Sequence, residues 1–222
     1  GGGWETAAEP AFFPLAAGGW LATCDTNPLW ALEAHPDKHG NAVSLGEESV
    51  EAWVSAIDSA RALIRDHLPD LAGEHAQVLA TVVPVGVEPE RSLSASYREA
   101  IGQVYVSLHP QTLVMAEALI HETQHNKLNL LLWSDPLVQD DGALLPSPVR
   151  PDLRPVLGVL LAAHAFLPVA ALHRALIASG HPLADPERLQ AVDRLNREAL
   201  AVLADARPTE VGRVLLDGMR AP

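Results

Sequence analysis

The sequence predicts an α+β fold, in which a small sheet packs on one long helix and a mainly helical half completes the chain. Three observations predict it: a first helical pattern, then short strand-like runs, and then three further helical patterns. The helical patterns lie at residues 48–68, 110–132, 155–178 and 186–206, and the strand-like runs at 77–87, 92–97 and 103–108.

Residues 1–47 are rich in glycine, proline and turn pairs, so we expect them to be irregular. Large aromatic residues within them predict that the segment docks onto the core: Trp4, Phe12, Phe13, Trp20 and Trp30. We expect a single catalytic domain over residues 1–222. The chain starts with Gly1 and not with methionine, so we also expect a tag remnant or a piece of a longer polypeptide, which leaves a missing domain open.

The first helix is predicted from apolar residues that share one face at three- and four-residue steps: Val50, Val54, Ile57, Ala60, Ile64 and Leu68. Pro69 ends it. Pro110 suits the first turn of the next helix, because its missing N–H has no partner there anyway. Pro168 is expected to interrupt the third helix, and Asp185 is the start signal of the fourth.

Composition limits the classes of partner and the compartment. The net charge is −13, from 28 acidic against 15 basic residues, which argues against a nucleic-acid partner or an anionic membrane surface. Cys24 is the only cysteine, which excludes an internal disulfide framework and a cysteine-rich metal module. We find no uninterrupted apolar stretch of membrane-spanning length and no signal-peptide pattern. We therefore expect a soluble cytoplasmic protein without a membrane partner.

The motif His121-Glu122-Thr123-Gln124-His125 lies within the helix predicted for residues 110–132. Histidines four residues apart lie about 40° apart around a helix, so both imidazoles project from one face and can share a metal ion. Glu122 lies beside them, where it can bond a metal-bound water as the general base of a metallopeptidase does. The alternatives are two hydrogen-bonded core histidines and a carboxylate that only supports the site.

A third ligand is expected from a later helix. His164 is the one histidine of the apolar run 160–166, and a buried imidazole needs a partner that a metal ion would provide. A core histidine held by hydrogen bonds is the alternative, and His173 is the reserve ligand.

The residues after the motif do not continue as known metallopeptidase patterns do. Residues 126–131 lack the glycine and third histidine of one pattern, and no glutamate occurs between Glu122 and Glu187. Aspartates remain as carboxylate ligands: Asp135, Asp140, Asp141 and Asp152. The motif therefore indicates a metal site without specifying a protease.

Six short segments spread over residues 25–175 form a specific pattern together: 25–29 (DTNPL), 33–38 (EAHPDK), 94–102 (SASYREAIG), 104–110 (VYVSLHP), 117–128 (EALIHETQHNKL) and 150–155 (RPDLRP). This pattern resembles the HExxH-type peptide β-hydroxylases. These enzymes depend on Fe(II) and 2-oxoglutarate and mature ribosomally made peptide natural products.

The resemblance implies a zincin-like scaffold with three histidine ligands, His121, His125 and His164, and hydroxylation of a side-chain β-carbon in a precursor peptide. Glu122 would then orient the ligands and not activate a hydrolytic water. Three protein ligands on octahedral Fe(II) leave room for bidentate 2-oxoglutarate and O₂. The distal carboxylate of 2-oxoglutarate suits a guanidinium fork. Arg150 and Arg154 are the best placed by sequence, with surface or loop-tying roles as the alternative.

Ser96 and Tyr97 lie on a predicted strand, where an extended peptide substrate could add along a sheet edge; an ordinary polar sheet face is the alternative. Asn129, about 80° around the helix from His121, is a further candidate substrate contact. A leader-peptide-binding partner is left open. The alternative functions are a zinc metallopeptidase with Glu122 as general base and a binding module that keeps the scaffold without activity.

Overall fold

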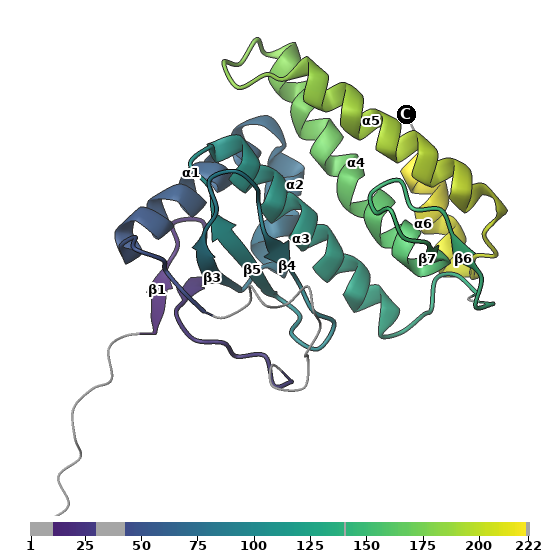
Figure 1. Ribbon diagram of the computed structural model, residues 1–222, viewed down its shortest axis with the longest axis horizontal. Helices are drawn as coiled ribbons and strands as arrows, with labels where there is room; N and C mark the ends of the chain where they lie inside the picture. The colour runs from purple at the N-terminus through teal and green to yellow at the C-terminus, as the bar shows by residue number, and fades with distance from the viewer. Residues whose placement is uncertain (1–10, 30–42, 140, 221–222) are drawn as a thin grey trace, which may run out of the picture.

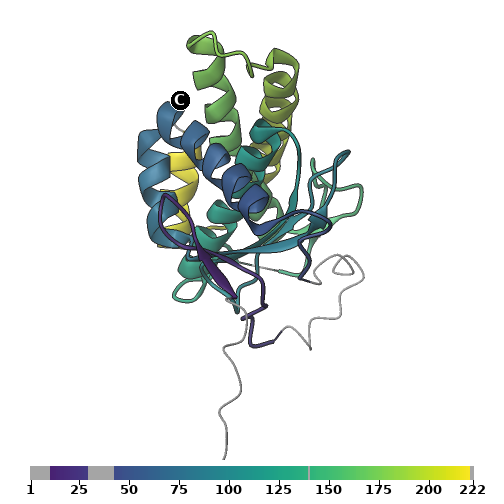
Figure 2. The same ribbon diagram turned by 90° about the vertical axis from the view of Figure 1, so that its left-hand side faces the viewer.

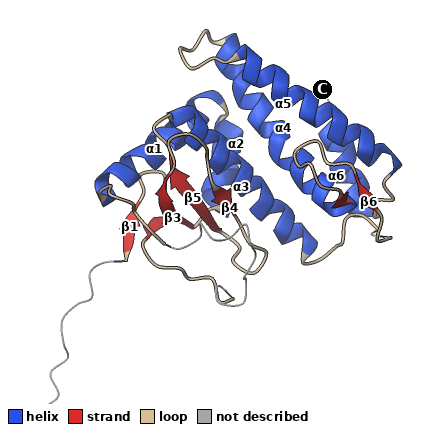
Figure 3. Ribbon diagram, in the orientation of Figure 1, coloured by secondary structure: helices blue, strands red, loops and turns tan. Residues whose placement is uncertain are grey.

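The computed structural model describes residues 11–29, 43–139 and 141–220 of the chain. The fold is α+β, as the sequence predicts: a five-stranded mixed sheet packs against the helix that carries His121, Glu122 and His125, and a mainly helical C-terminal half follows. Figure 1 shows the sheet and its helices beside a layer formed by the later helices. The colouring by secondary structure in Figure 3 makes this division visible.

The main sheet has the strand order β1-β2-β3-β5-β4. Its strands are β1 (Phe12–Pro14), β2 (Trp20–Ala22), β3 (Thr81–Val87), β4 (Ser94–Ala95) and β5 (Gln103–Leu108). The three inner strands run parallel, and the edge strands β1 and β4 are antiparallel to their neighbours. Every residue of β5 is buried, as expected for a strand covered on both faces. The short strand β4 lies at one edge of the sheet and contacts the motif helix.

The first half contains the helices α1 (Val50–His67), α2 (Pro69–Val78) and α3 (Thr112–Leu132). Ser49 caps the N-terminus of α1, where its hydroxyl accepts a hydrogen bond of 3.2 Å from the backbone N–H of Ala52. α2 follows directly, because Pro69 cannot continue α1 but suits the first turn of a new helix. α3 contacts α1, α2, β4 and β5. It is therefore enclosed on several sides, which places the motif inside the fold.

The two faces of the sheet are covered differently. Val82, Val104 and Val106 belong to the main core, together with residues of α1 and α3. Val83 and Tyr105 lie on the opposite face, in a smaller apolar cluster. Figure 2 shows the helices gathered on one side of the strands. The motif helix thus lies on the helical face, against the main core.

The second half contains the helices α4 (Val156–Ala178), α5 (Pro186–Val202) and α6 (Glu210–Arg220), a 3-10 turn at Leu203–Asp205, and a two-stranded sheet of β6 (Leu144–Leu145) and β7 (Arg154–Pro155). α4 packs against both α3 and α5. Pro168 lies inside α4, which continues through it, so the expected interruption is wrong. Proline removes one backbone hydrogen bond, and buried packing before and after it offsets that loss.

α4 is long and apolar enough to cross a bilayer by length and composition alone. Of its most apolar window, 56% is buried inside the structure, which is also the pattern of a core helix. The length and composition of α4 are therefore only weak evidence for a membrane span.

Several elements differ from the sequence-based expectation. The N-terminal segment was expected to be irregular, yet it adds β1 and β2 to the sheet, and Leu15 and Leu21 dock it into the main core. Residues 77–78 belong to α2 and not to a strand, and α6 was not predicted. Two predictions lie outside the described residues: the segment 33–38 that contributes to the resemblance, and the docking of Trp4 and Trp30.

Candidate metal centre

The imidazoles of His121 and His125 converge one turn apart on α3. Their Nε2 atoms lie 2.9 Å apart, and their ring centroids are 4.4 Å apart at an interplanar angle of 87°. Two nitrogens that each bind a metal ion at about 2.1 Å are separated by a comparable distance. The pair therefore points both ligand atoms at one position, as the four-residue spacing predicts.

Both imidazoles are held in the neutral form that binds metal ions. Burial, with smaller contributions from the charges of His125 and Arg188, lowers the pKa of His121 to about 3. Burial also lowers the pKa of His125, against the opposing effect of the Glu122 carboxylate. Since a metal ion binds deprotonated imidazole, neither ring has to release a proton at neutral pH.

Glu122 is the most strongly fixed residue of the motif. It is 2% exposed, and its two carboxylate oxygens accept hydrogen bonds of 2.7 Å from the hydroxyls of Ser94 and Ser96. Ser94 lies in β4 and Ser96 directly after it, so the edge strand, which contacts α3, orients the carboxylate. These two hydrogen bonds fix the direction of the carboxylate.

His121, Glu122 and His125 form a group whose potential ligand atoms all lie within 4.8 Å of one another. Two neutral imidazoles and one carboxylate are a donor set that suits Zn²⁺ and also Fe(II), which uses it with open positions in oxygenases. The chemistry of these donors therefore fits a divalent ion. This is a candidate metal site, and the donor set does not specify which metal occupies it.

His164 on α4 lies outside that group of three among the described residues. Burial lowers its pKa to about 4, with smaller contributions from Lys127 and His125, and its backbone partner is Gln124 of the motif. Its Nδ1 is buried without a hydrogen-bond partner. The ring therefore lies near the motif helix, and its role as third ligand stays a prediction.

His173, the reserve ligand, is engaged elsewhere. It is fully buried, and its Nε2 lies 2.8 Å from Oε1 of Glu117. The guanidinium of Arg188 on α5 binds both oxygens of the same carboxylate. This network joins α3, α4 and α5 one turn before His121.

The aspartates considered as ligands also have other partners. Asp135 accepts a hydrogen bond of 2.6 Å from the Thr209 hydroxyl, and Asp141 pairs with Arg207. Asp152 lies 2.7 Å from Nε of Arg154. None of these three belongs to the described group around His121, and Asp140 lies outside the described residues.

A cavity of about 360 Å³ opens beside the two histidines, and both Arg150 and Arg154 line it. Phe166 of α4 also lines it, with its ring centroid 4.8 Å from that of His121. The structure thus brings the predicted metal ligands and the predicted guanidinium groups to one cavity. Binding of 2-oxoglutarate by these arginines stays a prediction.

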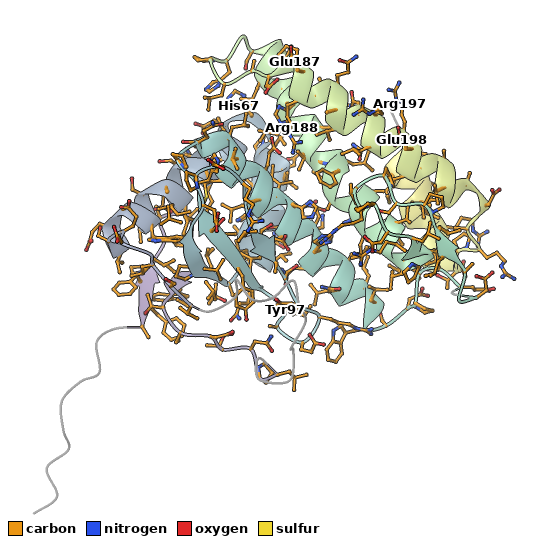
Figure 4. All side chains as sticks on the ribbon, viewed as in Figure 1. His67, Tyr97, Glu187, Arg188, Arg197 and Glu198 are labelled. Carbon is orange, nitrogen blue, oxygen red and sulfur yellow. The ribbon has the colours of Figure 1, made fainter. Side chains whose placement is uncertain are left out.

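A second cavity, of about 430 Å³, shares Phe166 and His121 with the first, and Ser94, Glu117 and Arg188 are among its other lining residues. Figure 4 shows Arg188 on α5 with its side chain on the side of α3. Neither Glu117 nor Arg188 was predicted from the sequence as a site residue. The spacing Glu117, His121, His125 along one helix face was a signal that could have found the first of them.

The predicted substrate contacts are spread around the motif. The Ser96 hydroxyl is bound to Glu122, and the Tyr97 ring lies 5.2 Å from the Tyr105 ring, on the sheet side of the molecule in Figure 4. Asn129 is buried one turn after His125. Their contact with a substrate stays a prediction.

Asn126 is a site residue that was not predicted from the sequence. Its side-chain oxygen accepts a hydrogen bond of 2.7 Å from the backbone N–H of Gly102, and its amide nitrogen donates to the carbonyls of Gln103 and Glu122. It therefore fixes the motif turn to the start of β5. A polar residue directly after His125, in an otherwise buried helix, was the available signal.

Comparison of the chain with protein-family models and with curated proteins gave no match. The function therefore has to be argued from the geometry of the site and the resemblance of its motifs.

Proposed function

We propose that the protein hydroxylates a side-chain β-carbon of a ribosomally made precursor peptide, using Fe(II) and 2-oxoglutarate. The observation that carries the proposal is the shared cavity of about 360 Å³, which both His121 and His125 line together with Arg150 and Arg154. A site of this chemistry needs a metal position and, within a few ångströms, a cation that can anchor a dicarboxylate.

When bound, Fe(II) and 2-oxoglutarate supply the activation of O₂ that converts a C–H bond to C–OH, while 2-oxoglutarate is split to succinate and CO₂. The residues of the chain bind and orient the reactants. His121 and His125 present neutral nitrogens, and Glu122 presents a carboxylate fixed by two hydroxyls. Arg150 and Arg154 would hold the distal carboxylate of 2-oxoglutarate, and the Phe166 ring packs edge-on against the His121 ring.

The peptide would add to the free side of β4. This strand is the edge of the sheet and pairs with β5 on its other side. An extended peptide binds such an edge through backbone hydrogen bonds, with alternate side chains pointing to the same face. Since Ser94 and Ser96 hold Glu122 from this strand, a peptide on β4 would lie next to the metal position.

A zinc metallopeptidase is the second candidate. The observation that favours it is the carboxylate of Glu122 within 4.8 Å of the histidine nitrogens, where a general base would lie. Both oxygens of that carboxylate already accept a serine hydroxyl, so only their remaining lone pairs can take a proton from water. This arrangement suits a fixed carboxylate better than a base.

The test is incubation of metal-free protein with Fe(II), ascorbate, 2-oxoglutarate and candidate precursor peptides in air. We expect succinate and a peptide that has gained one oxygen atom, in equal amounts, and neither product with His121→Ala. Parallel samples with Zn²⁺ and no 2-oxoglutarate test the second candidate. Cleaved peptide in those samples, lost in Glu122→Gln, would replace the hydroxylase by a peptidase.

A further inference from the structure

A third cavity, of about 260 Å³, lies between α1 and α2, away from the metal centre. Apolar side chains form most of its wall: Ile64, Pro69, Ala72 and Ala76. Three polar side chains also line it: the buried Arg61 and His75, and the exposed Arg65. None of the three takes part in the proposed hydroxylation, so a ligand of this cavity would be independent of that proposal.

Arg61 carries a buried charge, and two of its three guanidinium nitrogens make no hydrogen bond in the described structure. The residue is 4% exposed, and its Nη1 donates to the carbonyl of Gly18 at 2.5 Å. Its Nε and Nη2 have no hydrogen-bond partner in the described structure and are themselves buried, so a ligand in the cavity reaches them when the Arg61 side chain turns toward it. Burial lowers the pKa of Arg61, and the charge of Asp58 opposes this effect; both oxygens of Asp58 accept a hydrogen bond from the backbone N–H of Ala16. A buried cation left in this state is costly.

The geometry of the two unused nitrogens specifies what would bind them. Nε and Nη2 form one edge of the planar guanidinium, with two N–H bonds that point in parallel directions. This edge matches the two oxygens of a carboxylate, which it binds in bidentate fashion. The side chain therefore presents the geometry of a carboxylate site and not only a positive charge.

His75 also lines the cavity, and its ring adds a further requirement on the ligand. It is 3% exposed, its Nδ1 lies 3.1 Å from the Thr123 hydroxyl, and its Nε2 has no partner in the described structure. Burial, together with the charge of Arg61, lowers its pKa to about 3, so the ring is neutral. When Thr123 donates to Nδ1, the ring proton lies on Nε2, which then offers a third donor to the cavity.

We propose that this cavity binds a small aliphatic carboxylic acid in its ionised form. The Nε and Nη2 groups of Arg61 hold the two carboxylate oxygens, the Nε2–H of His75 donates to one of them, and the apolar wall covers the alkyl chain. Inorganic phosphate has more oxygens but no apolar part, so it leaves that wall in contact with water. Through the bond from His75 to Thr123, the ligand is linked to the helix of the metal motif.

The probe is sodium hexanoate, titrated into metal-free full-length protein by calorimetry and by NMR of the arginine Nε–H groups. We expect saturable binding with a shift of the Arg61 resonance, and no binding of hexanol, its neutral analogue. His121→Ala should bind hexanoate as the parent does, which separates this site from the metal centre. Equal binding of hexanol, or tighter binding of phosphate than of hexanoate, would overturn the proposal.

Two substitutions locate the site. Arg61→Lys keeps the charge but removes the planar fork, and it should weaken hexanoate binding by about tenfold or more. A Cβ at Gly73 would meet no atom within 4 Å, so Gly73→Leu can occupy the cavity without contacting Arg61 through its first carbon. It should abolish binding without lowering the thermal midpoint, and it tests the site even if Arg61→Lys does not fold. Arg91→Gln, at an exposed arginine outside the cavity lining, is the matched control and should leave hexanoate affinity unchanged. Unchanged hexanoate affinity in Gly73→Leu would place the ligand elsewhere and contradict the proposal.

Discussion

Removal of the two hydroxyls that hold Glu122 should weaken metal binding without unfolding the chain. In the double variant Ser94→Ala/Ser96→Ala, the carboxylate of Glu122 loses both hydrogen bonds of 2.7 Å. Hydrogen bonds to a charged group contribute about 1.5–3 kcal/mol each. Loss of a group that orients a metal ligand typically lowers affinity by about 10–100-fold. We expect each single variant near the lower end of that range and the double variant near the upper end.

The assay is a competition titration of Zn²⁺ or Co²⁺ between the metal-free protein and a chromophoric chelator. Ser92 lies two residues from Ser94 and lines the neighbouring cavity, so Ser92→Ala is a matched control. It should change the affinity by less than about twofold, as surface substitutions away from such contacts do. A urea midpoint for each variant separates a weakened site from a destabilised fold.

A double variant that folds normally and binds the ion as tightly as the parent would refute this reasoning. Glu122 would then not contribute to the metal site through its fixed orientation. In that case His164 would be the better candidate for the third ligand, and His164→Ala should show the loss of affinity instead.

Two further predictions concern stability. His75 and His121 have folded-state pKa values of about 3, below the unfolded value of about 6.5, so the unfolded chain binds more protons between these values. The free energy of unfolding of the metal-free protein should therefore fall as the pH drops below about 6.5, by at most ~1.4 kcal/mol per pH unit for each histidine. The urea midpoint should fall with it, and a midpoint that rises would contradict this. Gly212→Ala should destabilise, because its Cβ would lie 1.7 Å from the Leu137 carbonyl oxygen, whereas Gly218→Ala on the same helix meets no atom within 4 Å and should stabilise by about 0.5–1 kcal/mol. Thermal midpoints that rank the two variants in the opposite order would show that α6 does not pack as described.

Local patterns predicted the parts of the fold that depend on local chemistry. The limits of β5 and the span of α3 followed from alternation and from the helical pattern after Pro110. α2 was missed because Pro69 both ends one helix and starts the next, and only the end was recognised. β1 and β2 have three residues each, which is too short for periodicity to show.

In the candidate site, too, only the contacts within one helix could be predicted from the sequence. The convergence of His121 and His125 follows from a four-residue step on one helix, so sequence alone was sufficient. The serines that hold Glu122 lie 28 and 26 residues away in the chain, and Arg188 lies 71 residues from Glu117. Such contacts arise from tertiary packing. They cannot be predicted from the periodicity of residues along the chain.

The central claim is that the cavity beside His121 and His125 binds Fe(II) together with 2-oxoglutarate, and this can be measured without knowing the peptide. Under anaerobic conditions, Fe(II) and 2-oxoglutarate bound to one another at a protein site give a visible charge-transfer absorption band. We expect this band to saturate at one Fe(II) per chain in the parent, to need higher 2-oxoglutarate concentrations in Arg154→Gln or Arg150→Gln, and to be absent in His125→Ala. Stoichiometric binding of Fe(II) with no band on addition of 2-oxoglutarate would contradict the account.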